Sequence, residues 1–170
     1  MRELAQLHDV GRVSETKAST YMTDPDPFNL ERFVSAQTAV FLTVMEELTA
    51  GRKRSHWMWY IFPQLRGLGH SSMAKYYEIG SLDEARGYLG HTLLGPRLNL
   101  CTRTVLAVED RSPHDIFGSP DDMKFHSAMT LFALAASNQE TVYRQALDRW
   151  WQGRVDERTM ALLDSTPHRR

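Results

Sequence analysis

An unbroken block of large side chains at residues 56–62, with the sequence HWMWYIF, constrains the fold of this chain more than any other stretch. It holds two of the four tryptophans, and its last six positions carry no charged residue. An amphipathic helix has a polar face, whereas a helix that is apolar on every side is buried on every side. We therefore expect a central helix that begins near Ser55 and ends or kinks at Pro63, with the rest of the protein packed around it.

Other helices are marked by capping residues and by apolar residues at helical spacing. A helix is expected from an Asn29 cap to a Gly51 stop, because apolar residues recur with the helical period between them. Further helices are predicted at 73–79 (short or irregular), 81–89, 92–109, 120–137, 138–153 and 157–163, with caps at Ser81, Asn138 and Asp156 and Ser-Pro starts at Ser112 and Ser119. No stretch alternates with period two. The predicted fold class is all-α, a compact multihelical single domain of about seven or eight helices.

Prolines set the predicted start of this domain. Pro25 and Pro27 interrupt helix formation and favour an extended chain. Residues 1–23 are polar and poor in aromatic side chains, so we expect a mobile or weakly ordered tail. The domain is predicted to cover residues 24–164 and to be followed by a frayed C-terminus at 165–170. A chain of 170 residues is long enough for one domain with a full core.

Charge and composition exclude several classes of protein. The net charge of −1 gives no general attraction to nucleic acid or to an anionic membrane, and no apolar run is long enough to span a bilayer. Cys101 is the only cysteine, so neither a disulfide framework nor a cysteine zinc site is expected. Residues 1–20 lack the apolar core of a signal peptide, and we predict a cytoplasmic location.

The residues around the aromatic block also carry a family resemblance. The string from Ser55 to Leu65, SHWMWYIFPQL, with the following Gly67-Leu68-Gly69, closely resembles the signature of the bacterial family known as domain of unknown function 1810. Matching pieces across roughly residues 24–150 are Asp26-Pro27-Phe28, Arg32-Phe33, Ala36-Gln37, Tyr88-Leu89, Leu94-Gly95-Pro96-Arg97-Leu98, Asp122, Lys124-Phe125 and Met129-Thr130-Leu131-Phe132. The resemblance implies a compact multihelical fold with buried central helices, and it implies no activity. His91 follows Gly90 where the family tends to have a His-Pro pair, which weakens a catalytic role for His91.

Polar groups at the two ends of the predicted central helix form the first candidate site. Helix-start amides, a nearby lysine and flexible glycines are the components of an anion site, and aromatic rings beside them would stack on a flat ligand. The candidates are Lys53, Ser55, His56, Trp59, Gln64, His70 and Ser71. Lys75, just after the glycines, would hold a phosphate or activate a hydroxyl, or else be a surface charge. These residues predict a small anionic ligand, either nucleotide-like or phosphorylated.

A second group is the stretch from Asp121 to Ser127, near the start of the predicted helix at 120–137. Lys124 and Ser127 are one turn apart and share a face. If that face meets the aromatic block, Lys124 would lie beside His56 or Gln64. The alternative is structural, with Asp122 complementing the helix dipole and pairing with a nearby base.

Known motifs for metals and cofactors are absent from the sequence. The seven histidines show neither an i, i+4 pair nor an HExxH pattern, so no metal site is predicted. Gly67-Leu68-Gly69 lacks the third glycine and the preceding strand of a dinucleotide-binding motif, and no Walker or Gly-x-Ser-x-Gly sequence occurs. No cofactor is predicted, and the sequence leaves open whether the protein is an enzyme.

Two other functions compete with ligand binding. In the first, the aromatic block is purely core and the protein is a non-catalytic interaction module that binds an unidentified protein partner on an outer face. In this case Ser55 serves only as a cap, and no deep polar cavity is expected near His56. In the second, Arg52, Lys53 and Arg54 bind nucleic acid, which we do not expect of three basic residues on a nearly neutral protein.

Overall fold

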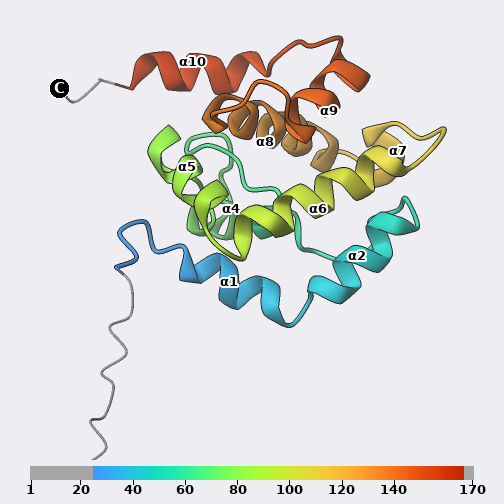
Figure 1. Cartoon of the computed structure of the whole chain (residues 1–170), viewed down its shortest axis with the longest axis horizontal. Helices are drawn as coiled ribbons and strands as arrows, with labels where there is room; N and C mark the ends of the chain where they lie inside the picture. The colour runs from blue at the N-terminus through green and yellow to red at the C-terminus, as the bar shows by residue number, and fades with distance from the viewer. Residues whose placement is uncertain (1–24, 167–170) are drawn as a thin grey trace, which may run out of the picture.

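The computed structural model describes residues 25–166 and confirms the all-α class, with ten helices in that part of the chain instead of seven or eight (Figure 1). The helices are α1 (Glu31–Thr38), α2 (Phe41–Thr49), α3 (Met58–Ile61), α4 (Ser72–Tyr76), α5 (Leu82–Gly90), α6 (Leu94–Ala107), α7 (Pro113–Phe117), α8 (Asp121–Ala135), α9 (Val142–Trp151) and α10 (Glu157–Ser165). Leu65 and Ile79 form an isolated parallel bridge. The predicted tail at 1–23 and the end of the chain from residue 167 lie outside the described residues. No helix of the described part combines the length and the apolar character needed to cross a membrane.

Helix α8 lies at the centre of the bundle. It packs against α5, α7, α9 and α10, and in Figure 1 α10 lies on one side of it while α1 and α2 form the opposite side of the molecule. The six consecutive residues 127–132 are all buried, so this helix has no solvent-facing side over that stretch. Burial on every side, which was expected of the aromatic block, is therefore found in α8.

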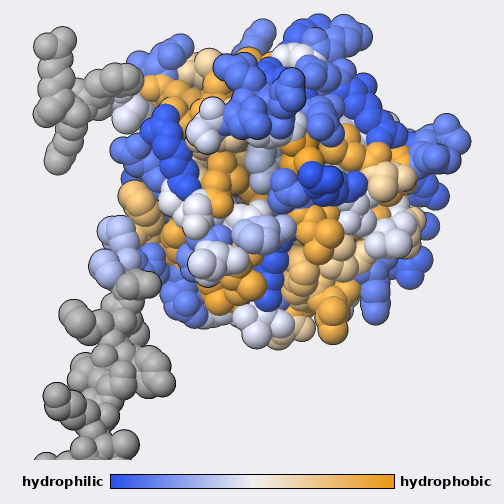
Figure 2. All heavy atoms as spheres, viewed as in Figure 1, coloured by the Kyte–Doolittle hydropathy of each residue, from blue (hydrophilic) through white to orange (hydrophobic). Residues whose placement is uncertain are grey.

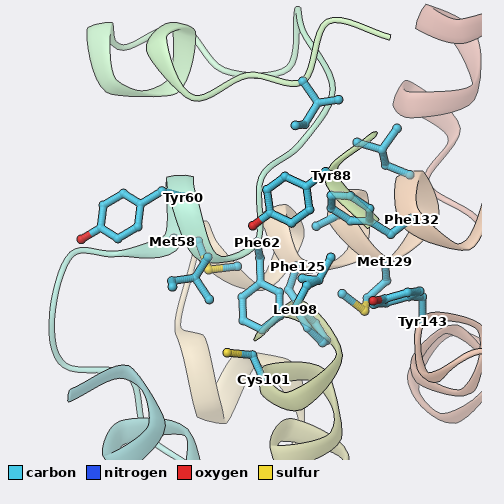
Figure 3. Packing of buried hydrophobic residues seen from close by; sticks show 14 of the residues in the cluster. Met58, Tyr60, Phe62, Tyr88, Leu98, Cys101, Phe125, Met129, Phe132 and Tyr143 are labelled. Atoms are coloured by element: carbon cyan, nitrogen blue, oxygen red, sulfur yellow. The ribbon is translucent and has the colours of Figure 1, made fainter. Parts of the chain in front are cut away.

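The aromatic block is buried as predicted, but only one turn of it is helical. Helix α3 covers Met58–Ile61, and the residues on either side leave the helical conformation. Trp57 and Phe62 are each 1% exposed, whereas Trp59 is half-buried. Figure 3 shows Phe62 packed beside Phe125 while Tyr60 points away from that group. The prediction of a longer helix is wrong, because the chain turns on either side of α3 and the rings of the block point in different directions.

The helix predicted from Asn29 to Gly51 is divided into α1 and α2. Its apolar spacing was predicted correctly, since Phe33 and Leu48 are fully buried. The break near residues 39–40 accompanies a buried side chain, because the Gln37 amide donates to the Tyr60 carbonyl at 2.7 Å. The end at Gly51 is as predicted: this glycine has a φ of +68°, which side-chain-bearing residues rarely adopt.

The start of α1 also differs from the prediction. Asn29 has a φ of 52° and is not the capping residue. The Asp26 carboxylate accepts the backbone N–H groups of Leu30 at 2.7 Å and Glu31 at 2.9 Å, and so satisfies the free amides of the first turn. The carboxylate of Asp26, four residues before Leu30, therefore caps this helix.

The remaining caps were partly predicted. Ser81, Ser112 and Asp156 cap α5, α7 and α10 as expected. Asn138 does not cap α9, because its side chain accepts the Glu140 amide while Thr141 accepts the Arg144 amide. Ser119 does not cap α8, whose first residue is Asp121.

Candidate functional site

The segment leading into the aromatic block is held by one buried carboxylate. Glu47, on α2, accepts the backbone N–H groups of Arg54 at 2.8 Å and Ser55 at 3.0 Å, together with the Ser55 hydroxyl. It also accepts the buried indole N–H of Trp57 at 2.8 Å. Burial by itself would raise the pKa of Glu47, but these hydrogen bonds outweigh burial and lower the pKa to about 2. Ser55 is therefore a structural partner of Glu47.

Beyond this segment, two lysines converge on one aspartate at the start of α8. The Lys53 ammonium lies 2.9 Å from Asp121 Oδ2, and the Lys124 ammonium lies 3.1 Å from Asp121 Oδ1. The Lys53 side chain is only 8% exposed, and those of Asp121 and Lys124 are 19% and 23% exposed. We call these three residues the lysine cluster. Two ammonium groups facing one carboxylate leave one positive charge in excess.

Each lysine of the cluster also lies against a tryptophan ring. Lys53 Nζ is 5.2 Å from the ring centre of Trp57, and Lys124 Nζ is 5.4 Å from that of Trp59. At these distances the ring faces attract the ammonium groups. The tryptophans thus place both positive charges beside the aromatic block, and Trp57 also fills the core.

A very small cavity adjoins Lys124. It is lined by Met58, Trp59, Phe62, Gln64, Ala74, Tyr77 and Lys124, and its volume is about 10 Å³. That space is enough for about one water molecule. Lys124 does lie beside Gln64, as predicted, but the cavity in its present form has no room for a nucleotide.

The structure brings together four of the predicted site residues and separates the others. Lys53, Trp59, Gln64 and Lys124 belong to the lysine cluster or its cavity. His56, His70, Ser71 and Lys75 are exposed and do not line this cavity, and Ser71 caps α4. Ser127 is buried and its hydroxyl lies 3.0 Å from an Asp156 oxygen, so it connects α8 to α10.

Two residues central to this region were not predicted as site residues. Asp121 and Glu47 look like ordinary helical acids in the sequence, since nothing local shows what reaches them. The one available signal was the i, i+3 spacing of Asp121 and Lys124. Asp122, which was expected to pair with a base, lies 3.0 Å from His114 Nδ1.

Comparison with known proteins is consistent with the resemblance of the aromatic block. The family model described as "Protein of unknown function (DUF1810)" matches residues 27–163. The chain belongs to this family. The conserved hypothetical protein Rv1873 from Mycobacterium tuberculosis, known from a crystal structure, shares 55% sequence identity with this chain. The match covers 83% of this chain and 100% of that chain, with a TM-score of 0.80. No curated protein matches the chain. Neither the family description nor the description of that crystal structure names an activity.

Proposed function

We propose that this protein binds a small anionic ligand, phosphorylated or nucleotide-like, at the lysine cluster. The observation that carries the proposal is the sharing of one carboxylate, Asp121, by two largely buried lysines. Charges with little exposure are screened less than surface charges, so the excess positive charge attracts an anion more strongly here than at an exposed lysine. Asp121 is the first residue of the 15-residue helix α8, whose amino-terminal end also favours negative charge.

The cavity limits how such a ligand is held. A volume of about 10 Å³ admits no phosphate group, so the ligand would lie at the mouth of the cavity or displace part of its wall. Helix α4 is the part of the wall best suited to move, because it is five residues long and has no buried residue. An outward shift of Ala74, which lies on α4, would open the space beside Trp59, whose half-buried ring is available for stacking.

The test is a calorimetric titration of the protein with inorganic phosphate, with a nucleotide and with a sugar phosphate. Lys124→Gln and Lys53→Gln are each expected to weaken binding by about 10-fold or more, because hydrogen bonds to charged groups contribute about 1.5–3 kcal/mol. Lys75→Gln is the matched control, since Lys75 is exposed and outside the cluster. Each single cluster variant leaves Asp121 with one lysine partner, so the fold should be retained. Absence of binding at millimolar ligand, or equal effects of all three substitutions, would refute the proposal.

A second function, protein interaction without catalysis, is favoured by a different observation. The aromatic block fills the core, while Leu42 on α2 and Leu100 on α6 are 80% and 46% exposed. Figure 2 shows apolar surface over the region of α2 and α6, interrupted by polar residues. Exposed apolar surface of this kind is typical of a docking face.

This alternative is tested with variants of α2 in a copurification experiment. A defined partner should be retained by the wild-type protein and lost with Leu42→Asp. The control is Thr43→Asp, which adds the same charge at the neighbouring exposed position. Equal retention by both variants would exclude Leu42 from the contact.

A further inference from the structure

A larger hollow lies on another side of the start of α8, apart from the lysine cluster. Its volume is about 250 Å³, and it is lined by Ser112, Pro113, His114, Asp122, Met123, His126, Trp150 and Trp151. The lining contains two tryptophans and two histidines but no lysine or arginine. Pockets for drug-sized ligands measure about 300–1,000 Å³, so this hollow suits a single small ring system.

The wall formed by Trp151 is held rigidly. The His126 imidazole stacks on the Trp151 indole with 4.1 Å between ring centres and 7° between ring planes. His126 Nε2 in turn lies 2.9 Å from the Arg154 carbonyl oxygen. Because a carbonyl only accepts hydrogen bonds, this nitrogen carries the hydrogen and the imidazole is fixed in place. Trp151 is therefore positioned before any ligand arrives.

The wall formed by Trp150 is held in a similar way. The Arg149 guanidinium lies 4.7 Å from the centre of the Trp150 ring. Arg149 itself donates to the Leu106 carbonyl and, at 2.8 Å, to the Val108 carbonyl at the end of α6. Two half-buried tryptophans that are each fixed by a dedicated partner lose little freedom on binding, which lowers the entropic cost of complex formation.

The His114 imidazole gives the hollow a hydrogen-bond acceptor that remains available to a ligand. His114 Nδ1 lies 3.0 Å from Asp122 Oδ2, and an ionised carboxylate only accepts hydrogen bonds. In the neutral imidazole the hydrogen therefore sits on Nδ1, and Nε2 is left as an acceptor. Within residues 25–166 no hydrogen bond engages this Nε2, and the side chain is 68% exposed.

We propose that this hollow is a binding site for a small, uncharged planar heteroaromatic ring that bears an N–H group. The ring would stack against the fixed tryptophans and donate its N–H to His114 Nε2. The ligand of this hollow is expected to differ from the anion of the lysine cluster, because the only fully charged group in the lining is the negative Asp122 carboxylate. The site does not depend on the lysine cluster.

Indole and benzofuran test the proposal, since the two have nearly the same shape and only indole has an N–H. Each is titrated into the full chain while the indole N–H signals of the four tryptophans are followed by NMR. Saturable shifts confined to Trp150 and Trp151 are expected, with indole bound about fivefold more tightly than benzofuran, the worth of about one hydrogen bond. Absence of saturable shifts, or equal affinity for both probes, would overturn the proposal.

Substitution of His114 separates the hydrogen bond from simple stacking. His114→Leu should abolish the preference for indole while weak binding of both probes persists, and the exposed position should leave the fold intact. His70→Leu, at an exposed histidine that does not line the hollow, should keep the fivefold preference. Lys124→Gln should also leave it unchanged, so that failure here and failure of anion binding are distinguished. A preference that survives in His114→Leu would overturn the assigned acceptor.

Discussion

Replacement of Glu47 by glutamine tests how the aromatic block is anchored. Three N–H groups, from Arg54, Ser55 and the Trp57 indole, converge on Glu47 Oε2, and the Ser55 hydroxyl bonds Oε1. Glutamine has the same shape and can place its carbonyl oxygen where Oε2 lies. The substitution therefore removes the negative charge while leaving an acceptor for the three N–H groups.

The size of the effect follows from the pKa of Glu47. A pKa that falls from 4.5 to about 2 on folding corresponds to about 3 kcal/mol of stability, present in full above pH 4.5. Because the folded-state pKa is the lower one, this contribution is lost as the pH falls from 4.5 through 2. Glu47→Gln should therefore cost about 3 kcal/mol at pH 7 and lower Tm by about 6–12 °C for a domain of this size.

Urea denaturation followed by tryptophan fluorescence measures the free energy of unfolding at a series of pH values. The difference between wild type and Glu47→Gln should shrink as the pH falls below 4.5, because wild-type Glu47 itself becomes neutral. Glu46→Gln is the control, since Glu46 is the exposed neighbour on α2 and should change stability little. Equal stability of Glu47→Gln and wild type at pH 7, or a difference that does not change with pH, would refute the reasoning.

Three further predictions concern other parts of the fold. Gly51→Ala should destabilise the protein by about 1–2 kcal/mol, measured by urea denaturation, because φ is +68° and a Cβ would lie 2.9 Å from a Val108 methyl carbon. Thr141→Ala should cost about 1 kcal/mol in the same assay through loss of the α9 cap, whereas Asn138→Ala should cost less. Cys101 should resist alkylation at pH 8 until the protein unfolds, because burial raises its pKa to about 12; modification in the native state would contradict this.

Local signals were sufficient for several helix boundaries, and they failed where a distant residue decides. The Ser81, Ser112 and Asp156 caps could be predicted because each bonds an amide only three residues away. The break between α1 and α2 could not, since it accompanies the hydrogen bond between Gln37 and the Tyr60 carbonyl, 23 residues apart in sequence.

The candidate site shows the same division. The sequence identified Lys53 and Lys124 as separate basic residues, and the proximity of Lys124 to Gln64 was predicted on the condition that their faces meet. The role of Asp121 in joining the two lysines was not recognised, because its ion pair with Lys53 spans 68 positions. The hollow beside Trp150 was missed because its lining comes from α7, α8 and α9 together.

By itself the sequence determined that this protein is helical, that residues 57–62 are largely buried, and which family it belongs to, because these properties depend on composition, spacing and short motifs. Tertiary structure decided which helix is central. The run from Ala128 to Ala135 in α8 is apolar but for one threonine, and its small residues let α5, α9 and α10 pack around it. The bulky rings of Trp57 to Phe62 instead need space on several sides, so the chain turns after α3 and places them among several helices. The volumes of the side chains that pack together, which hydrophobicity alone does not encode, therefore determine which helix is central.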